Sequence, residues 1–595
     1  MGDYLVMTWP PGKPGQAAEA LRADFEADGT WRAAYREYGI AVYVRGRTAP
    51  AVHVLPARGG VLIGDLFDRA ATEAGDVADY ALTSMIDAPP LDIAQALIHR
   101  AWGRYVAVLR DRDGPPFILR DPTGAVECLT WTREAVTIVA SDVPTSGLAA
   151  PIGLAVDWTG LNGLVARHGL GSQICPLAGV TVVAPGHVRG GRAGEDHRLW
   201  SPGDFVRRPK PDVQPADLAR VVDATVAALA RDRRAILVEI SGGLDSAIVA
   251  TSLARCGASV TQAINHYWPQ PEGDERMWAR GIAERCGYPL AEGARDLLRL
   301  DGEVLMRHAH GPRPGFNAQD PALDQDLADR ALDLGADALF SGQGGDGVFY
   351  QMAPPGLAAD IVLGQPTPNG RANALAVLAR RSRSTVWAVC AGALTPRHRL
   401  AVEPQPPAYL PPGRSRPGPH PWIADVRGVS PAKRVQVRGL ANAQAAFGES
   451  LRGRAARLSY PLMSQPVTEL CLSIPAPLLA IGEVDRPFAR TAFADRLPAA
   501  SLTRRSKGAV TKYFSQSLAA SAPALREFLL DGRLVREGLI LRDRLEEMLD
   551  PEAMIWRDNV GEICLAAYLE AWVQVWEGKL AGRARPDPRL AQGRA

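Results

Sequence analysis

Two glycine-rich segments hold the residues with the clearest capacity for chemistry. The first, Ser241-Gly242-Gly243-Leu244-Asp245-Ser246, follows an apolar run at 235–240 and precedes a helix-like stretch. In a strand–glycine turn–helix unit, backbone N–H groups and the positive end of the helix dipole face an anion, and the serine hydroxyls add donors. This pattern predicts a phosphate-binding loop; the plainer alternative is a tight strand-to-helix connection.

The second segment is Ser341-Gly342-Gln343-Gly344-Gly345-Asp346, which also follows an apolar run. Loops that leave the carboxyl ends of parallel strands open at one edge of the sheet, so we expect Asp245 and Asp346 to face each other across a bound nucleotide. Two carboxylates and phosphate oxygens form a typical Mg²⁺ site. For Asp346 alone, a turn-forming aspartate beside glycine is the alternative.

The elements that must position these loops can be predicted from periodicity. Strand-like and helix-like segments alternate from about residue 215, which is typical of a parallel sheet with helices on its faces. Residues 260–268 predict the next strand and 273–287 a capped helix after it. We expect an adenine base at the turn between them, near Asn265 and His266. His266 is expected to pack at the rim rather than to act in catalysis.

The chain before the first loop has a different pattern of apolar and polar residues. Residues 36–185 alternate apolar and polar positions in short runs between Gly, Pro and Asp, which is typical of a β-rich domain. The proline-containing segment 207–215 is expected to be a linker. We therefore predict two domains, 1–207 and 208–595.

Beyond residue 350 the pattern is mostly helical. It is interrupted at 403–421 by a proline-rich stretch that cannot form a regular helix or ladder. That stretch predicts a mobile surface loop.

Composition limits the kinds of partner. The formal net charge is +2 and 22% of residues are charged, so no long-range attraction to nucleic acid or an anionic membrane is expected. The N-terminus MGDYLVMTWPPGKPG lacks the features of a signal peptide, and no apolar run approaches the roughly 20 residues that span a bilayer. We expect a cytosolic protein. Its seven cysteines form no CxxC pair, so disulfides and zinc are not expected.

The two glycine loops, spaced in this way, resemble the synthetase domain of the asparagine synthetase superfamily. YPLMSQPVTELCLSIP (460–475) and RPFARTAFADRLPAASLTRRSKG (486–508) are similar to two further segments of that superfamily, and the resemblance covers about residues 215–580. It implies an α/β fold of the adenine-nucleotide α-hydrolase type, with a doubly wound parallel sheet and a helical extension. It also implies cleavage of ATP to AMP and pyrophosphate with Mg²⁺. Lys507 would then neutralise charge on the α-phosphate and the leaving group, whereas an exposed loop lysine is the alternative.

The first 200 residues resemble the N-terminal glutamine amidotransferase domain of that superfamily, a β-rich sandwich of the Ntn type. The similarity lies in GVLIGDLFDR (60–69) and YVAVLRDRDGPPFILRDPTG (105–124). An active glutaminase needs a cysteine where this chain has Gly2 and an oxyanion-hole asparagine where it has Ile63. We expect a degenerate domain that makes no ammonia and serves as structural support or holds a substrate.

The residue at position 343, Gln343, helps to predict which kind of amide bond the enzyme forms. By family resemblance, asparagine synthetases have glutamate at this position and β-lactam synthetases have tyrosine, whereas a glutamine side chain cannot accept a proton. The SGQGGD loop and the inert IGDLFDR-type domain are similar to lasso peptide cyclases, which join a peptide's N-terminal amine to an Asp or Glu side chain. A strong base is not needed there, because an α-amino group with a pKa of about 8 is partly neutral near pH 7.5. Gln343 could hydrogen-bond the peptide or orient the acyl group, or it could be a packing residue.

The sequence thus predicts an ATP- and Mg²⁺-dependent synthetase that forms a macrolactam through an isopeptide bond. The expected catalytic residues are Asp245, Gln343, Asp346 and Lys507, with Asp245 and Asp346 as metal ligands. The residues expected to bind ATP and pyrophosphate are Ser241, Gly242, Gly243, Leu244, Asp245, Ser246, Asn265, His266, Ser341, Gly342 and Gly344. A precursor peptide is the expected partner, and the resemblance adds a leader peptidase or recognition protein. A small-molecule amide synthetase and a non-catalytic scaffold that binds nucleotide or peptide remain the alternatives.

Overall fold

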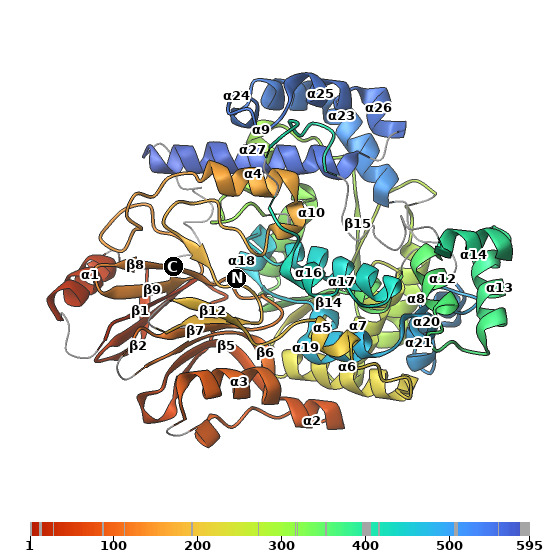
Figure 1. The fold of residues 1–595 in the computed structure, drawn as a ribbon, viewed down its shortest axis with the longest axis horizontal. Coiled ribbons are helices and arrows are strands. Elements are labelled where there is room, and N and C mark those ends of the chain that lie inside the picture. The colour runs from red at the N-terminus through yellow and green to blue at the C-terminus, as the bar shows by residue number, and fades with distance from the viewer. Residues whose placement is uncertain are drawn as a thin grey trace.

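In the part of the chain that the structure describes, helices surround three β-sheets (Figure 1). The computed structural model describes residues 3–10, 15–27, 29–85, 88–111, 114–191, 194–271, 273–315, 317, 319–351, 354–394, 406–414, 417–504, 510–556 and 559–582.

Two six-stranded antiparallel sheets are formed by the N-terminal part of the chain. The first, in the order β10-β8-β9-β1-β3-β2, consists of β1 (Asp3–Thr8), β2 (Arg32–Glu37), β3 (Ile40–Arg45), β8 (Leu129–Arg133), β9 (Val136–Ala140) and β10 (Thr181–Val182). The second, in the order β12-β11-β7-β6-β5-β4, consists of β4 (Val52–Leu55), β5 (Gly60–Asp68), β6 (Ala101–Leu109), β7 (Phe117–Arg120), β11 (His187–Gly190) and β12 (Glu195–Arg198). The β-rich structure predicted for residues 36–185 is confirmed.

The two antiparallel sheets pack face to face. Val42 of the first sheet and Ile63 and Val106 of the second lie in one buried apolar core. On the outer faces, α1 (Gly15–Ala27) joins the core of the first sheet and α3 (Pro90–Arg100) joins that of the second. Alternation of side chains along each strand produces both cores, because successive residues point to opposite faces of the sheet.

A five-stranded sheet, entirely parallel, lies at the centre of the rest of the chain. Its order is β15-β14-β13-β16-β17. The strands are β13 (Ile236–Glu239), β14 (Val260–Tyr267), β15 (Leu290–Ala294), β16 (Ala338–Phe340) and β17 (Arg457–Ser459). The strands predicted at 235–240 and 260–268 are therefore confirmed, as is the strand before the second glycine loop.

Helices cover both faces of the parallel sheet. Ile236 and Val238 pack with α6 (Pro215–Ala230), α7 (Leu244–Arg255) and α8 (Arg276–Cys286). Leu237, which points the other way, packs with α10 (Pro321–Asp333) and the end of α18 (Leu451–Ala455). The neighbouring strands β13 and β16 are buried on both faces, which explains why the sequence before each glycine loop is mostly apolar rather than alternating.

Among the described residues, the remaining helices are short apart from two in the C-terminal part. They are α2 (Arg69–Ala74), α4 (Trp158–Ala166), α5 (Gly203–Val206), α9 (Gly302–Arg307), α11 (Gly345–Val348), α12 (Pro354–Val362), α13 (Arg371–Arg381), α14 (Val386–Leu394), α16 (Pro421–Asp425), α17 (Pro431–Ala443), α19 (Gln465–Ser473), α20 (Ala476–Ala480), α21 (Pro487–Ala492), α22 (Ala499–Thr503), α23 (Val510–Leu530), α24 (Arg533–Arg536), α25 (Arg542–Met548), α26 (Pro551–Trp556) and α27 (Val560–Leu580). The predicted helical character beyond residue 350 is confirmed. In the described parts of the chain, no helix combines the length and apolar character needed to cross a bilayer.

The proline-rich stretch at 403–421 departs from its prediction. Its described residues before Pro421 form no helix or strand, as expected. However, Tyr409 is fully buried, and its hydroxyl donates to the carbonyl of Glu562 at 3.0 Å. The prediction of a surface loop is therefore wrong at Tyr409, because an aromatic side chain anchors the stretch against α27.

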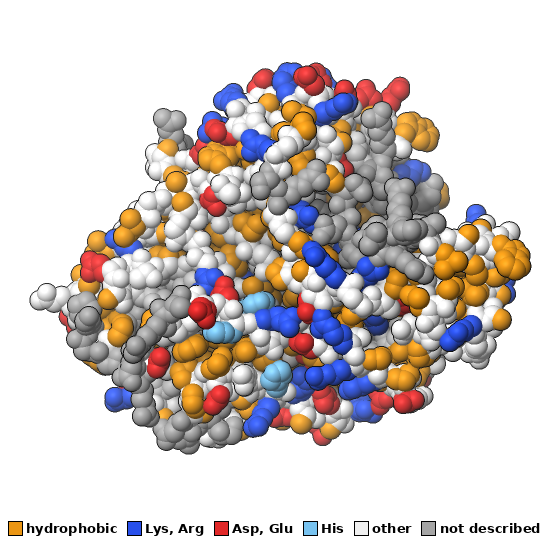
Figure 2. All heavy atoms as spheres, viewed as in Figure 1, with side chains coloured by type: hydrophobic (Ala, Val, Ile, Leu, Met, Phe, Trp, Pro, Cys, Tyr) orange, Lys and Arg blue, Asp and Glu red, His pale blue; other side chains and the backbone are white. Residues whose placement is uncertain are grey.

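The apolar helix α14 lies at the surface. Figure 2 shows hydrophobic side chains gathered over α13 and α14 at the right edge of the molecule. Trp387 on α14 is 84% exposed, and Val386 and Leu394 on the same helix are also exposed. The exposed side chains of α14 are thus mostly apolar.

A buried ion cluster joins the N-terminal sheets to the parallel sheet. The carboxylate of Asp65 on β5 accepts hydrogen bonds from Arg104 at 2.6 Å and from Arg457 of β17 at 2.6 Å. Burial alone would raise the pKa of Asp65, but these arginines lower it well below its usual value. Since β17 pairs with β16, the cluster lies one strand away from the second glycine loop.

Candidate active site

The first glycine loop connects β13 to α7 through a turn that requires glycine. Gly242 has φ +75°, and a Cβ there would lie 2.9 Å from the carbonyl oxygen of Glu275. The hydroxyl of Ser246 accepts from the N–H of Ser241 at 3.1 Å and so closes the loop. Gly243 is the N-cap of α7. Because glycine has no side chain, no capping side chain stands between the first N–H groups of the helix and a bound anion.

The second glycine loop lies directly against the first. A Cβ added to Gly342 would lie 2.6 Å from the carbonyl carbon of Asp245, and one added to Gly345 would lie 2.6 Å from an oxygen of the Asp245 carboxylate. This contact follows from the sheet order, in which β13 and β16 are neighbours. The prediction that both loops open at one edge of the sheet is confirmed.

The carboxylates of Asp245 and Asp346 face each other, and an arginine lies between them. Nη1 of Arg486 donates to Oδ1 and Oδ2 of Asp245, both at 2.7 Å, and to Oδ1 of Asp346 at 2.9 Å. Arg486 is the first residue of the segment 486–508 that resembles the superfamily, but that resemblance did not assign it to the site.

Arg486 is held in place from several sides. It is 4% exposed, its backbone is left-handed with φ +51°, and its Nε donates to Asp485 at 2.8 Å. Arg490 donates in turn to Asp485 at 2.6 Å. Burial disfavours the charged form of Arg486, but the carboxylates of Asp245, Asp485 and Asp346 raise its pKa. Burial likewise acts to raise the pKa of Asp485, and the two arginines lower it.

The donor set fits a divalent cation that also binds phosphate. The two carboxylates converge on one point, and the positively charged Nη1 of Arg486 occupies it. Oxygen ligands of this kind suit Mg²⁺. No group of three or more His, Cys, Asp or Glu side chains within the described residues could hold a metal by itself. A cation between Asp245 and Asp346 would therefore need further oxygens, such as those of a nucleotide.

Asn265 and His266 lie near the carboxyl end of the strand predicted at 260–268. That strand, β14, extends to Tyr267 and pairs with β15 as far as Ala294. Asn265 is buried and donates to the carbonyl of Ile240 at 2.7 Å, while its Oδ1 has no partner among the described residues.

The imidazole of His266 forms a hydrogen bond with the carboxylate of Asp326. Its Nε2 donates to Asp326 at 2.8 Å. This hydrogen bond, against the effect of burial, lowers the pKa of Asp326 to about 2. His266 thus has a structural partner, and contact of either His266 or Asn265 with adenine stays a prediction.

Gln343 is exposed at the tip of the second loop, where its N–H donates to the hydroxyl of Ser341 at 3.2 Å. Exposure removes packing as the reason for a glutamine at this position. Lys507 lies outside the described residues. Three positions before it, Arg504 donates to the carbonyl of Gly242 at 2.8 Å, pairs with Glu275 and stacks over the ring of Trp278 at 3.9 Å. Arg504 therefore anchors the end of α22 to the first loop.

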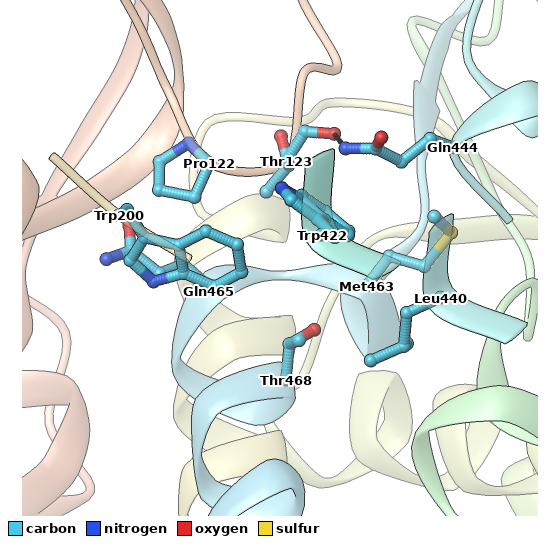
Figure 3. Close-up of a pocket in the computed structure, with 9 residues that line it drawn as sticks. All are labelled: Pro122, Thr123, Trp200, Trp422, Leu440, Gln444, Met463, Gln465 and Thr468. Atoms are coloured by element: carbon cyan, nitrogen blue, oxygen red, sulfur yellow. Dashed lines mark hydrogen bonds between the residues drawn. The ribbon is translucent and has the colours of Figure 1, made fainter. Parts of the chain in front are cut away.

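A small, mostly apolar cavity lies beside Met463, which contacts the second loop (Figure 3). The N-terminal part contributes Thr123 and Trp200, and the rest of the chain contributes Trp422 and Met463 among others. Gln444 closes one side by donating to the carbonyl of Thr123 at 3.3 Å. A Cβ at Gly344 would lie 2.9 Å from the sulfur of Met463, so Met463 separates the cavity from the second loop.

The position predicted to lack an oxyanion-hole donor is part of the apolar core. Ile63 on β5 is fully buried between the two antiparallel sheets and has no polar atom in its side chain. Gly2 lies outside the described residues.

Parts of this chain are similar in sequence to known proteins. A family profile described as "Asparagine synthase" matches residues 217–574, more than half of the chain, including both glycine loops and Arg486. Proteins described as 7-cyano-7-deazaguanine synthase are 40% identical in Saccharolobus solfataricus and 39% in Sulfolobus acidocaldarius, and 7-cyano-7-deazaguanine synthase 2 of Sulfurisphaera tokodaii is 37% identical. Each match spans 76 residues, which is 13% of this chain and 16% of the relative, so the chain spans only about a sixth of these relatives. The family match over the parallel sheet and both loops is the decisive one: the chain belongs to the asparagine synthase family, in which ATP drives the formation of amide bonds.

Proposed function

We propose that this protein is a lasso peptide cyclase. It would adenylate an Asp or Glu side chain of a precursor peptide and join it to the peptide's N-terminal amine, releasing AMP and pyrophosphate. The observation that carries the proposal is Gln343, which is exposed beside the paired carboxylates and cannot act as a base. The amine that reacts in such a site must arrive without help from a strong base, and an α-amino group does so.

In the first step, a carboxylate oxygen of the peptide attacks the α-phosphate of ATP. The new bond joins this oxygen to the α-phosphorus, and the bond to the bridging oxygen breaks, so pyrophosphate leaves with the electron pair. The backbone of residues 241–246 and the first turn of α7 hold the phosphates. Asp245 and Asp346 would hold Mg²⁺, which when bound offsets the negative charge of the leaving group. Lys507 adds a further positive charge there.

In the second step, the neutral amine attacks the activated carbonyl carbon. A C–N bond forms, the bond to AMP breaks, and the amine gives up one proton to solvent. Gln343 orients the acyl group or the peptide by hydrogen bonds through its amide. The peptide must be folded so that the amine nitrogen and the carbonyl carbon lie roughly 3 to 3.5 Å apart, because such positioning lowers the activation free energy.

The N-terminal sheets have no part in this chemistry under the proposal. With Gly2 in place of a nucleophile and Ile63 in place of an oxyanion donor, they do not release ammonia from glutamine. Their role is to seat the second loop through Asp65 and Arg457. The precursor peptide is the proposed partner, together with a leader peptidase or recognition protein.

The direct test is to incubate the protein with ATP, Mg²⁺ and a candidate precursor peptide. We expect AMP, pyrophosphate and a peptide lighter by one water. Appearance of ADP, or of asparagine from aspartate and ammonia, contradicts the proposal. Turnover of a small carboxylate and amine without any peptide would instead identify a small-molecule amide synthetase, and failure of ATP–pyrophosphate exchange would identify a scaffold.

Variants test the assigned residues. Asp245→Ala and Lys507→Ala should each reduce AMP release by at least ~100-fold, since each removes charge stabilisation at the leaving group. Matched controls are Asp329→Ala on α10 and Lys512→Ala on α23, both exposed, which should stay close to the wild-type rate. A near-normal rate for Asp245→Ala or Lys507→Ala would show that the residue was wrongly assigned.

A further inference from the structure

One guanidinium nitrogen occupies the point where the two site carboxylates converge. Nη1 of Arg486 lies 2.7 to 2.9 Å from three oxygens of Asp245 and Asp346. Oxygen ligands bind Mg²⁺ at about 2.0 to 2.1 Å. A metal held by the same oxygens would lie closer to Nη1 than two mutually repelling cations tolerate. Arg486 in this position and a metal bound to both aspartates therefore exclude each other.

We propose that Arg486 is a displaceable cation that couples metal binding to nucleotide binding. Without nucleotide, its guanidinium neutralises Asp245 and Asp346 and keeps free metal out. When metal and nucleotide arrive together, the guanidinium leaves the carboxylates and binds phosphate oxygens instead. The inference rests on the metal site of the proposed function but not on the peptide or the amide.

The surroundings of Arg486 explain why nucleotide is required for its release. The side chain is buried, so moving it off two carboxylates would leave a charge without a partner, which is costly. A polyphosphate supplies anionic oxygens in the geometry that a guanidinium prefers. Free metal supplies no such acceptor.

The anchoring of Arg486 limits the movement to the end of its side chain. Its backbone forms the N-cap of α21 and is followed by Pro487, and its Nε is bonded to Asp485. Asp485 is held by Arg490 through both its carboxylate and its backbone carbonyl. The guanidinium can therefore turn about the Nε end while Asp485 remains its partner.

The test measures metal binding without turnover. Mn²⁺ serves as the probe for Mg²⁺, and α,β-methylene-ATP, which cannot be cleaved at the reacting bond, serves as the nucleotide. Calorimetry gives the dissociation constants of free Mn²⁺ and of the preformed Mn²⁺–analogue complex for wild type, Arg486→Gln, Arg486→Lys and Asp245→Asn. Arg496→Gln, which removes an arginine paired with Asp223 away from the site, is the matched control.

We expect effects of opposite sign in Arg486→Gln. It should bind free Mn²⁺ at least ~10-fold more tightly than wild type and the Mn²⁺–analogue complex at least ~10-fold more weakly, within the usual range of coupling between sites. A merely structural defect would weaken both. Arg486→Lys keeps a cation and should exclude free Mn²⁺ as wild type does, Asp245→Asn should bind neither form well, and Arg496→Gln should match wild type.

The proposal is overturned if Arg486→Gln binds free Mn²⁺ no more tightly than wild type. It is overturned without any variant if the wild-type protein binds free Mn²⁺ as tightly as the Mn²⁺–analogue complex. If the opposite-sign pattern holds but no macrolactam forms with any peptide, the cyclase assignment fails and the role of Arg486 stands.

Discussion

At the scale of single residues, glycines allow the two loops to meet. The backbone of the second loop passes so close to Asp245 and Ser246 that Gly342 leaves no room for a Cβ. The carboxylates of Asp245 and Asp346 can then reach one cation. Their distance from each other is thus set by backbone contact between the loops as well as by the side chains.

Replacing Gly342 by alanine tests this contact. The added Cβ must push the loops apart, and a displacement of about 1 Å at a reacting site can lower a rate by ~100-fold. Gly342→Ala should therefore reduce ATP–pyrophosphate exchange by at least ~100-fold. Gly347→Ala, five residues later, is the control, because its Cβ would meet no atom closer than 3.6 Å. Equal rates in the two variants would mean that loop contact does not set the site.

Part of the site could be predicted from the sequence at this scale. The convergence of Asp245 and Asp346 follows from two glycine loops after parallel strands, and the structure brings both carboxylates to Nη1 of Arg486. Their roles as metal ligands stay predictions. The position of Arg486 could not be predicted, because it depends on a left-handed backbone and on contacts with residues far away in the chain. The strand predicted at 260–268 agrees with β14, but the partners of Asn265 and His266 could not be predicted, because they are Ile240 and Asp326, far away in the chain.

At the scale of elements, α27 supports the sheet region from one side. It runs across the upper part of the molecule in Figure 1, below α24 and α25, and is buried along most of its length. Trp572 and Trp576 both donate from their indole N–H to the carbonyl of Gly311, at 2.9 and 2.7 Å. A helix with apolar residues on all sides, such as this one, is expected in a core.

Truncation of Trp572 should be strongly destabilising. Trp572→Ala removes a fully buried ring and one of the two donors to Gly311, and such changes cost about 3 to 5 kcal/mol. Urea unfolding followed by far-ultraviolet circular dichroism measures the loss. Trp556→Ala on α26 is the control, since that side chain is 86% exposed and its loss should cost less than about 0.5 kcal/mol. A similar midpoint for both variants would contradict the assigned role of α27.

Elements were more predictable than their surroundings. The strands before both glycine loops and the helices after residue 350 follow from periodicity, because burial on both faces of the sheet leaves a continuous apolar run. The burial of Tyr409 could not be foreseen, because the prolines of the stretch 403–421 indicate only that it lacks regular structure. What covers such a stretch depends on α27, more than one hundred residues later.

At the scale of the whole molecule, His420 lies between the N-terminal part and the helices beside the second loop. Its Nε2 is 3.4 Å from the hydroxyl of Ser172, and its Nδ1 accepts from the N–H of Trp422 at 3.2 Å. Burial lowers the pKa of His420 to about 4. Protonation would turn the Nδ1 acceptor into a donor and so break the cap of α16.

The stability of the protein should therefore depend on pH through His420. In the unfolded chain the imidazole gains a proton near pH 6.5, whereas in the folded protein it stays neutral down to about pH 4. The contribution of His420 to the stability is complete above about pH 6.5 and is lost as the pH drops to about 4, by up to about 3 kcal/mol. Urea midpoints measured across this range give the slope.

The matched variants are His420→Asn and His197→Gln. An asparagine can still cap α16 without titrating, so His420→Asn should show a clearly flatter pH profile than wild type. His197 on β12 is exposed, and its replacement should leave the profile unchanged. An unchanged slope in His420→Asn would rule out His420 as the source.

The ion cluster at Asp65 has a consequence for how the N-terminal sheets can change over time. An exposed side chain on these sheets can be replaced freely, because its loss disturbs no neighbour. Asp65 cannot be replaced in that way, since its loss would leave Arg104 and Arg457 buried without a carboxylate and would disturb the strand beside the second loop. Selection can thus preserve the shape of this region through its contacts with the parallel sheet alone.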